Sequence, residues 1–138
     1  MVTEQPQLSH FIQLDDAYLG SLKERAHFYI EHQHLNRALM VLEMLHVLDE
    51  QDVLTQLLLA QTHLKMGYSL RAAAVVEPLV ECHPEHSDAK VLLARIRIAE
   101  GEFGAASDLL KEVVNEDPQG DTFAGRRARA VAGEVVQT

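Results

Sequence analysis

Apolar residues recur every three or four positions along most of this chain, which is the spacing of one face of an α-helix. The first such stretch carries Leu19, Leu22 and Ala26, and Asp15 or Asp16 can cap a helix that begins there. Further stretches predict helices at 35–48, from 53, at 69–82, from 87, from 103 to near 115, and after 121. No run alternates apolar and polar residues as a half-buried strand does. The pattern therefore predicts an all-α protein.

Single positions refine these helices. In the 35–48 stretch the buried candidates are Leu39, Leu42, Met44 and Leu45. Pro78 lies inside the 69–82 stretch and is expected to bend or shorten that helix, because proline lacks the backbone donor that a helix needs. Capping residues are expected before or at the start of three other helices, namely in Asp49–Asp52, at Ser87 and Asp88, and at Asp121.

A set of small residues and turn residues recurs with a period of 34 positions. Gly67 and Pro84 return as Gly101 and Pro118. Glycine adopts positive φ without steric cost, which suits a turn between two helices, and proline ends a helix. Alanines follow the same period in the pairs Ala26/Ala38, Ala60/Ala72 and Ala94/Ala106. The chain therefore holds three copies of one unit, and Gln33 takes the glycine position in the first.

This 34-residue period, with its small and turn residues, resembles the tetratricopeptide repeat over residues 19–118. The resemblance implies a solenoid of helical hairpins, built as a single domain over residues 1–138. Its parts are an N-terminal segment at 1–14, repeats at 19–52, 53–86 and 87–120, and a capping helix at 121–138 that covers the open end. Two positions depart from the family pattern. The large residue early in the first helix is Leu22, Gln56 or Lys90, and the later aromatic is Tyr29, His63 or Arg97.

Composition narrows the function classes. Acidic side chains outnumber basic ones by 21 to 12, and the formal charge of −9 disfavours binding to phosphate backbones. Nucleic acid is therefore not an expected partner. The first residues lack the basic and apolar regions of a signal peptide, and no apolar run reaches the about 20 residues that span a bilayer. We expect a cytoplasmic protein, and the single cysteine, Cys82, suits a reducing compartment.

The residues give no indication of catalysis. The chain has no Gly-rich phosphate loop and no nucleophile motif, so we expect neither enzymatic activity nor a cofactor. Of the eight histidines, His32 and His34 form one close pair and His83 and His86 another. Both pairs fall in predicted turns without nearby cysteine pairs, so no metal site is expected.

The resemblance also implies where a partner would bind, because solenoids of this family line their concave surface with the first helix of each repeat. Carried over position by position, this predicts a partner-binding groove formed by Lys23, His27, Ile30, Leu54, Leu57, Gln61, Leu64, Lys65, Val91, Arg95 and Ile98. Its apolar middle would hold an apolar helix or extended strand of another protein. Alternatively, the N-terminal segment or a second copy of the chain covers it.

A small, acidic protein of three such repeats resembles the tetratricopeptide-type chaperones of bacterial type III secretion systems, which hold a subunit before its export. The resemblance rests on size, acidity and architecture. We therefore predict a protein–protein interaction module, acting as a chaperone or adaptor. The alternatives are a scaffold subunit that assembles with itself as a homo-oligomer, and a metal-dependent enzyme.

Overall fold

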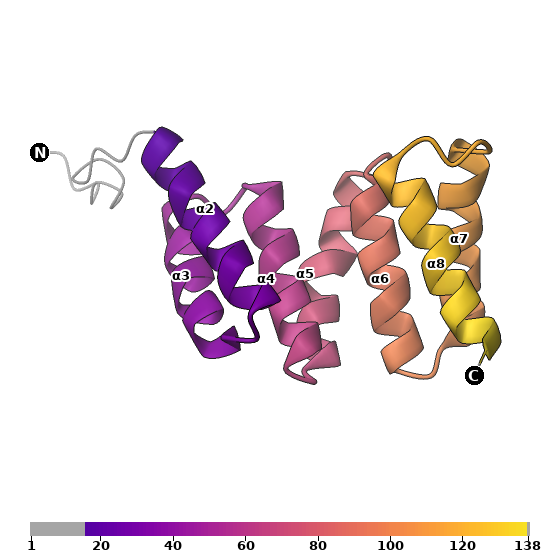
Figure 1. Ribbon diagram of the computed structural model, residues 1–138, viewed down its shortest axis with the longest axis horizontal. Coiled ribbons are helices and arrows are strands. Elements are labelled where there is room, and N and C mark those ends of the chain that lie inside the picture. The colour runs from indigo at the N-terminus through magenta and orange to yellow at the C-terminus, as the bar shows by residue number, and fades with distance from the viewer. Residues whose placement is uncertain (1–15, 138) are drawn as a thin grey trace, which may run out of the picture. The chain divides into compact units, whose positions relative to one another are not determined.

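The computed structural model describes residues 16–137, with side chains described as far as Val135. Helices fill this part of the chain, and it contains no strand (Figure 1). They are α2 (Asp16–Glu31), α3 (Leu35–Leu48), α4 (Val53–Lys65), α5 (Ser69–Cys82), α6 (Ser87–Ala99), α7 (Phe103–Glu116) and α8 (Phe123–Gln137). The predicted N-terminal segment at 1–14 lies outside the described residues.

The helix boundaries repeat with the period of the sequence. The second helices of the three hairpins begin at residues 35, 69 and 103, which are 34 positions apart. The first helices end at residues 31, 65 and 99, again 34 apart. The prediction of an all-α fold of repeated helical hairpins, like that of the tetratricopeptide repeat, is therefore confirmed.

The chain divides into two compact units, Met1–Thr62 and His63–Thr138, so the division falls within the last turn of α4. In the first unit, α2 and α3 form an antiparallel hairpin (Figure 1). Their buried side chains include Ala26 and Leu42, and Leu58 of α4 packs into the same core. Gln33 turns the chain between α2 and α3 with a φ of 62°, in the left-handed region that the later repeats give to glycine.

The second unit contains α5 to α8. Helix α6 is its most buried element, since it contacts α5, α7 and α8. A core of small and branched residues, among them Ala94, Ala106 and Val113, joins α6 to α7 and α8. Gly101 has a φ of 80° in the turn before α7, as the sequence predicted.

The helix caps confirm one expectation and correct two. Asp52 caps α4 as expected, since its carboxylate accepts from the Thr55 amide at 3.0 Å. Helix α6 is capped by the His86 ring rather than by Ser87 or Asp88, because His86 Nδ1 accepts from the Ala89 amide at 3.2 Å. Helix α8 is capped by Thr122 instead of Asp121, and the Thr122 hydroxyl accepts from the Gly125 amide at 2.9 Å.

Of the two effects expected of Pro78, shortening does not occur, because helix α5 continues past Pro78 to Cys82. The expected bend stays a prediction. Pro78 and Ala74, whose carbonyl loses its partner, are both exposed, so water can satisfy that carbonyl. In α3, Leu42 and Leu45 are buried as predicted and Leu39 is half-buried, but Met44 is 44% exposed.

Candidate protein-binding surfaces

A stripe of residues along one side of α4 carries most of the predicted apolar groove. Its members, spaced by three or four positions, are Leu54, Leu57, Gln61 and Leu64, and we call them the α4 stripe. Leu54 is 50% exposed and the other three are half-buried. The side of α4 away from the stripe is packed, because Leu59 lies in the core of the first unit and Thr55 and Thr62 are buried as well. One face of α4 is therefore packed against the core, and the α4 stripe on the other side is partly accessible to solvent.

Polar contacts fix the start of α4. The buried Thr55 hydroxyl donates to the Asp52 carboxylate at 2.6 Å, and Lys23 Nζ of α2 lies 3.0 Å from the same carboxylate. Partial burial of Asp52 would raise the pKa of its carboxyl group. The hydrogen bonds from Thr55 and Lys23 outweigh that effect, so the pKa lies below its usual value. Lys23, predicted as a groove residue, thus ties α2 to the first turn of α4.

The other predicted groove residues divide into buried and accessible ones. Ile30 is 1% exposed and Val91 is 3% exposed, so both are core residues and are left out of the surface proposed below. His27 is exposed and its Nε2 lies 3.0 Å from Glu31 on the same helix. Lys65 is exposed as well.

In the second unit, Arg95 and Ile98 of α6 are half-buried. Partial burial lowers the pKa of the Arg95 guanidinium, and the like charge of Arg127 on α8 lowers it further, while Glu134 opposes both. Ile98 packs against the core that α6 shares with α7 and α8. Both side chains lie partly open to solvent.

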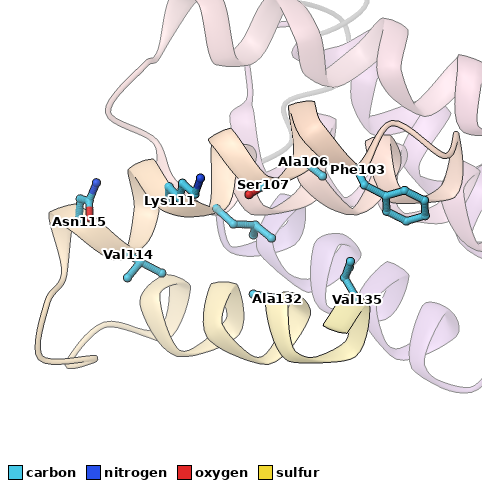
Figure 2. Close-up of a pocket in the computed structure, with 9 residues that line it drawn as sticks. Phe103, Ala106, Ser107, Lys111, Val114, Asn115, Ala132 and Val135 are labelled. Carbon is cyan, nitrogen blue, oxygen red and sulfur yellow. The ribbon is translucent and has the colours of Figure 1, made fainter. Parts of the chain in front are cut away.

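A pocket that the sequence did not predict lies between α7 and α8. It has a volume of about 300 Å³. Figure 2 shows side chains of both helices around it. The apolar lining consists of Phe103, Ala106, Leu110, Val114, Ala132 and Val135, and the polar lining of Ser107, Lys111 and Asn115. One signal was available in the sequence, since Ala106, Leu110 and Val114 lie four positions apart and share one apolar face of α7. The sequence predicted only that the last helix covers the open end of the solenoid.

Two buried or half-buried cations compensate for the departures from the family pattern. Lys90 of α6 is 6% exposed, and its Nζ lies 3.3 Å from Glu112 and 3.2 Å from Glu116 of α7. Burial lowers the pKa of Lys90, but these two carboxylates outweigh it and raise the pKa overall. The ion pairs join α6 to α7, so this cluster has a structural explanation.

Arg97 forms a similar link between helices. Its guanidinium lies 2.5 Å from Glu77 of α5 and 3.1 Å from Glu100. The hydrogen bond to Glu77 raises the pKa of Arg97, against the effect of burial. Within residues 16–137 no group of three or more His, Cys, Asp or Glu side chains could hold a metal ion. The same residues include no helix that is both long and apolar enough to cross a membrane.

A comparison with known protein families gives a match within the second unit. Residues 69–131, which run from the start of α5 into α8, match the tetratricopeptide repeat family. This match supports a tetratricopeptide repeat protein and covers just under half of the 138 residues. No curated protein matches the chain. The 34-residue register of the helices extends the same hairpin arrangement back to α2.

Proposed function

We propose that this protein is a chaperone or adaptor that holds an apolar segment of a partner protein against the α4 stripe. The coarser statement, a protein–protein interaction module, has the support of the repeat family, whose members generally bind proteins. The family is generally non-enzymatic, which favours binding over catalysis. The observation that carries the proposal is the half exposure of Leu54 on a helix whose other face is already packed.

The chemistry of the stripe suggests what the bound segment contains. Leu54, Leu57 and Leu64 would contact apolar side chains of the segment. Gln61 between them can donate one hydrogen bond to the segment and accept another from it. Lys65 at the end of the helix favours an acidic residue at that end of the segment. An amphipathic helix or an extended strand with alternate apolar residues fits this description.

The test is capture of the natural partner by variants of the stripe. Leu54→Asp and Leu57→Asp should lose the partner in a pull-down from the native cell, because each would bury a carboxylate against apolar side chains. Since Leu54 is half exposed, its variant should fold with little loss of stability. The matched control is Leu70→Asp on α5, where the leucine is 79% exposed and lies outside the stripe. It should retain the partner.

A second control separates binding from folding. Leu42 is fully buried, so Leu42→Ala should cost about 2–5 kcal/mol of unfolding free energy while its folded fraction still binds. Retention of the partner by both stripe variants, with normal melting curves, would contradict the proposal. Mass spectrometry of the captured protein also tests the finer form. A secretion subunit would support the chaperone role that the size, acidity and architecture suggest, with a cytoplasmic location.

A further inference from the structure

A second apolar surface lies on α3, on the side opposite its buried residues. Met40, Met44 and Val47 are spaced by four and three positions and therefore share one face of the helix. They are 72%, 44% and 66% exposed, and we call them the α3 stripe. Methionine side chains are flexible and adapt to irregular apolar surfaces. A contiguous exposed patch of this kind usually marks an interaction site.

The later repeats show that the fold does not require apolar residues here. Positions 34 and 68 residues further along carry Ala74, Pro78 and Glu81, and then Asp108, Glu112 and Asn115. Most of these are polar or small, and all are exposed. The same place on the second helix of the hairpin is therefore compatible with water in two repeats out of three. The large apolar residues of the first repeat need another explanation.

The pocket between α7 and α8 has the dimensions to receive this stripe. Along α7 its lining residues Ala106, Leu110 and Val114 span nine positions, which is about 12 Å from the first to the last at 1.5 Å per residue. The α3 stripe spans eight positions, or about 10 Å. Ala106 and Ala132 are small, which leaves depth for a side chain of the size of methionine.

The charges beside the two surfaces are complementary. Glu43 is exposed on α3, and by its helical position it borders the stripe beside Val47. Lys111 is exposed on α7 and lines the pocket (Figure 2). We propose that the α3 stripe of one copy docks into the α7–α8 pocket of a second copy, with Glu43 facing Lys111.

Such a contact is heterologous, because it joins two different surfaces. Each copy keeps one free stripe and one free pocket, so association continues into an open chain or a closed ring. One helix face in one groove makes a small interface, and the association should be weak. The residues involved are not those of the α4 stripe, so this inference stands or falls separately from the proposed function.

The first experiment measures mass against concentration by light scattering and sedimentation, up to about 1 mM, where weak complexes are populated. The wild-type mass should rise above 15.4 kDa as concentration increases. Met44→Asp and Val114→Asp should each remain at the monomer mass. An equimolar mixture of the two should form dimers and nothing larger, because the mixture contains only one working stripe and one working pocket. Leu54→Asp should assemble like the wild type.

The second experiment exchanges charges at exposed positions, where folding is not at risk. Glu43→Lys and Lys111→Glu should each weaken association several-fold, and the double variant should restore it. A wild-type protein that stays monomeric through 1 mM overturns the inference. Loss of assembly in Met44→Asp but not in Val114→Asp overturns it too, since that pattern would mean stripe-to-stripe pairing. If the double variant does not recover association, Glu43 does not face Lys111 and the proposed contact is wrong.

Discussion

Gly125 lies where α8 passes closest to the chain segment before it, and Gly125→Ala tests how tightly the two are packed. The Asp117 carboxylate accepts hydrogen bonds from the Asp121 and Thr122 amides, each at 2.9 Å, and from the Thr122 hydroxyl at 2.7 Å. A Cβ at position 125 would overlap Oδ2 of Asp117, and it would lie 2.8 Å from Cγ of Asp117 and 3.0 Å from the Thr122 hydroxyl. Both neighbours are held in place by these hydrogen bonds, so neither can move without loosening the start of α8.

The size of the effect follows from three contributions. Overpacking costs about 1–3 kcal/mol, and a weakened Thr122 cap costs about 1 kcal/mol. Alanine has a higher helix propensity than glycine, which returns about 1 kcal/mol. The net loss for Gly125→Ala is therefore about 1–3 kcal/mol of unfolding free energy. For a body the size of the second unit, each 1 kcal/mol lowers the melting temperature by about 4–8 °C.

The control uses the same substitution in the same helix. Gly133 is exposed on α8, and a Cβ there meets nothing within 4 Å. Gly133→Ala should therefore raise the unfolding free energy by about 0.5–1 kcal/mol through helix propensity alone. Thermal melting followed by circular dichroism measures both variants. If Gly125→Ala stabilises the protein as Gly133→Ala does, Asp117 does not pack closely against α8 at position 125, and the prediction is wrong.

Two further predictions concern acid stability and helix crossing. The hydroxyl and amide of Thr122 lower the pKa of Asp117 from 3.8 to about 2. The resulting stability is present above pH 4 and is lost as the pH falls toward 2. Asp117→Asn should reduce the pH dependence of the denaturant midpoint between pH 4 and pH 2. An unchanged pH dependence would show that Asp117 is not the group responsible. Ala72 is fully buried, so Ala72→Leu should cost about 1–3 kcal/mol in a melting experiment, whereas Ala74→Leu on the exposed side of α5 should change little. Equal melting temperatures for the two variants would show that Ala72 does not lie at a close helix contact.

The repeat could be predicted because its signals are local. A glycine at the end of a helix has one favoured role, and the φ values of Gly67 and Gly101, 85° and 80°, agree with it. The apolar spacing placed Leu42 and Leu45 in the core for a similar reason. These inferences depend on neighbours within one or two turns, so they hold before any tertiary contact is known.

The features that the sequence did not predict depend mainly on contacts between distant parts of the chain. Ile30 and Leu64 occupy equivalent positions of their repeats, yet Ile30 is buried and Leu64 is half-buried, because their neighbours differ. The α7–α8 pocket depends on how two helices pack together, which the apolar pattern of each helix alone does not show. His86 competes with Ser87 for the cap of α6, and propensity alone favours serine.

The three repeats differ most where their side chains meet solvent. Alanine occupies the equivalent buried positions 38, 72 and 106, because a larger residue would separate helices that pack closely. The exposed position two residues later is Met40, Ala74 or Asp108. Folding constrains the first set and leaves the second free. Large apolar residues at such free positions therefore carry information about binding rather than about the fold, as Leu54 of the α4 stripe and Met40 of the α3 stripe do.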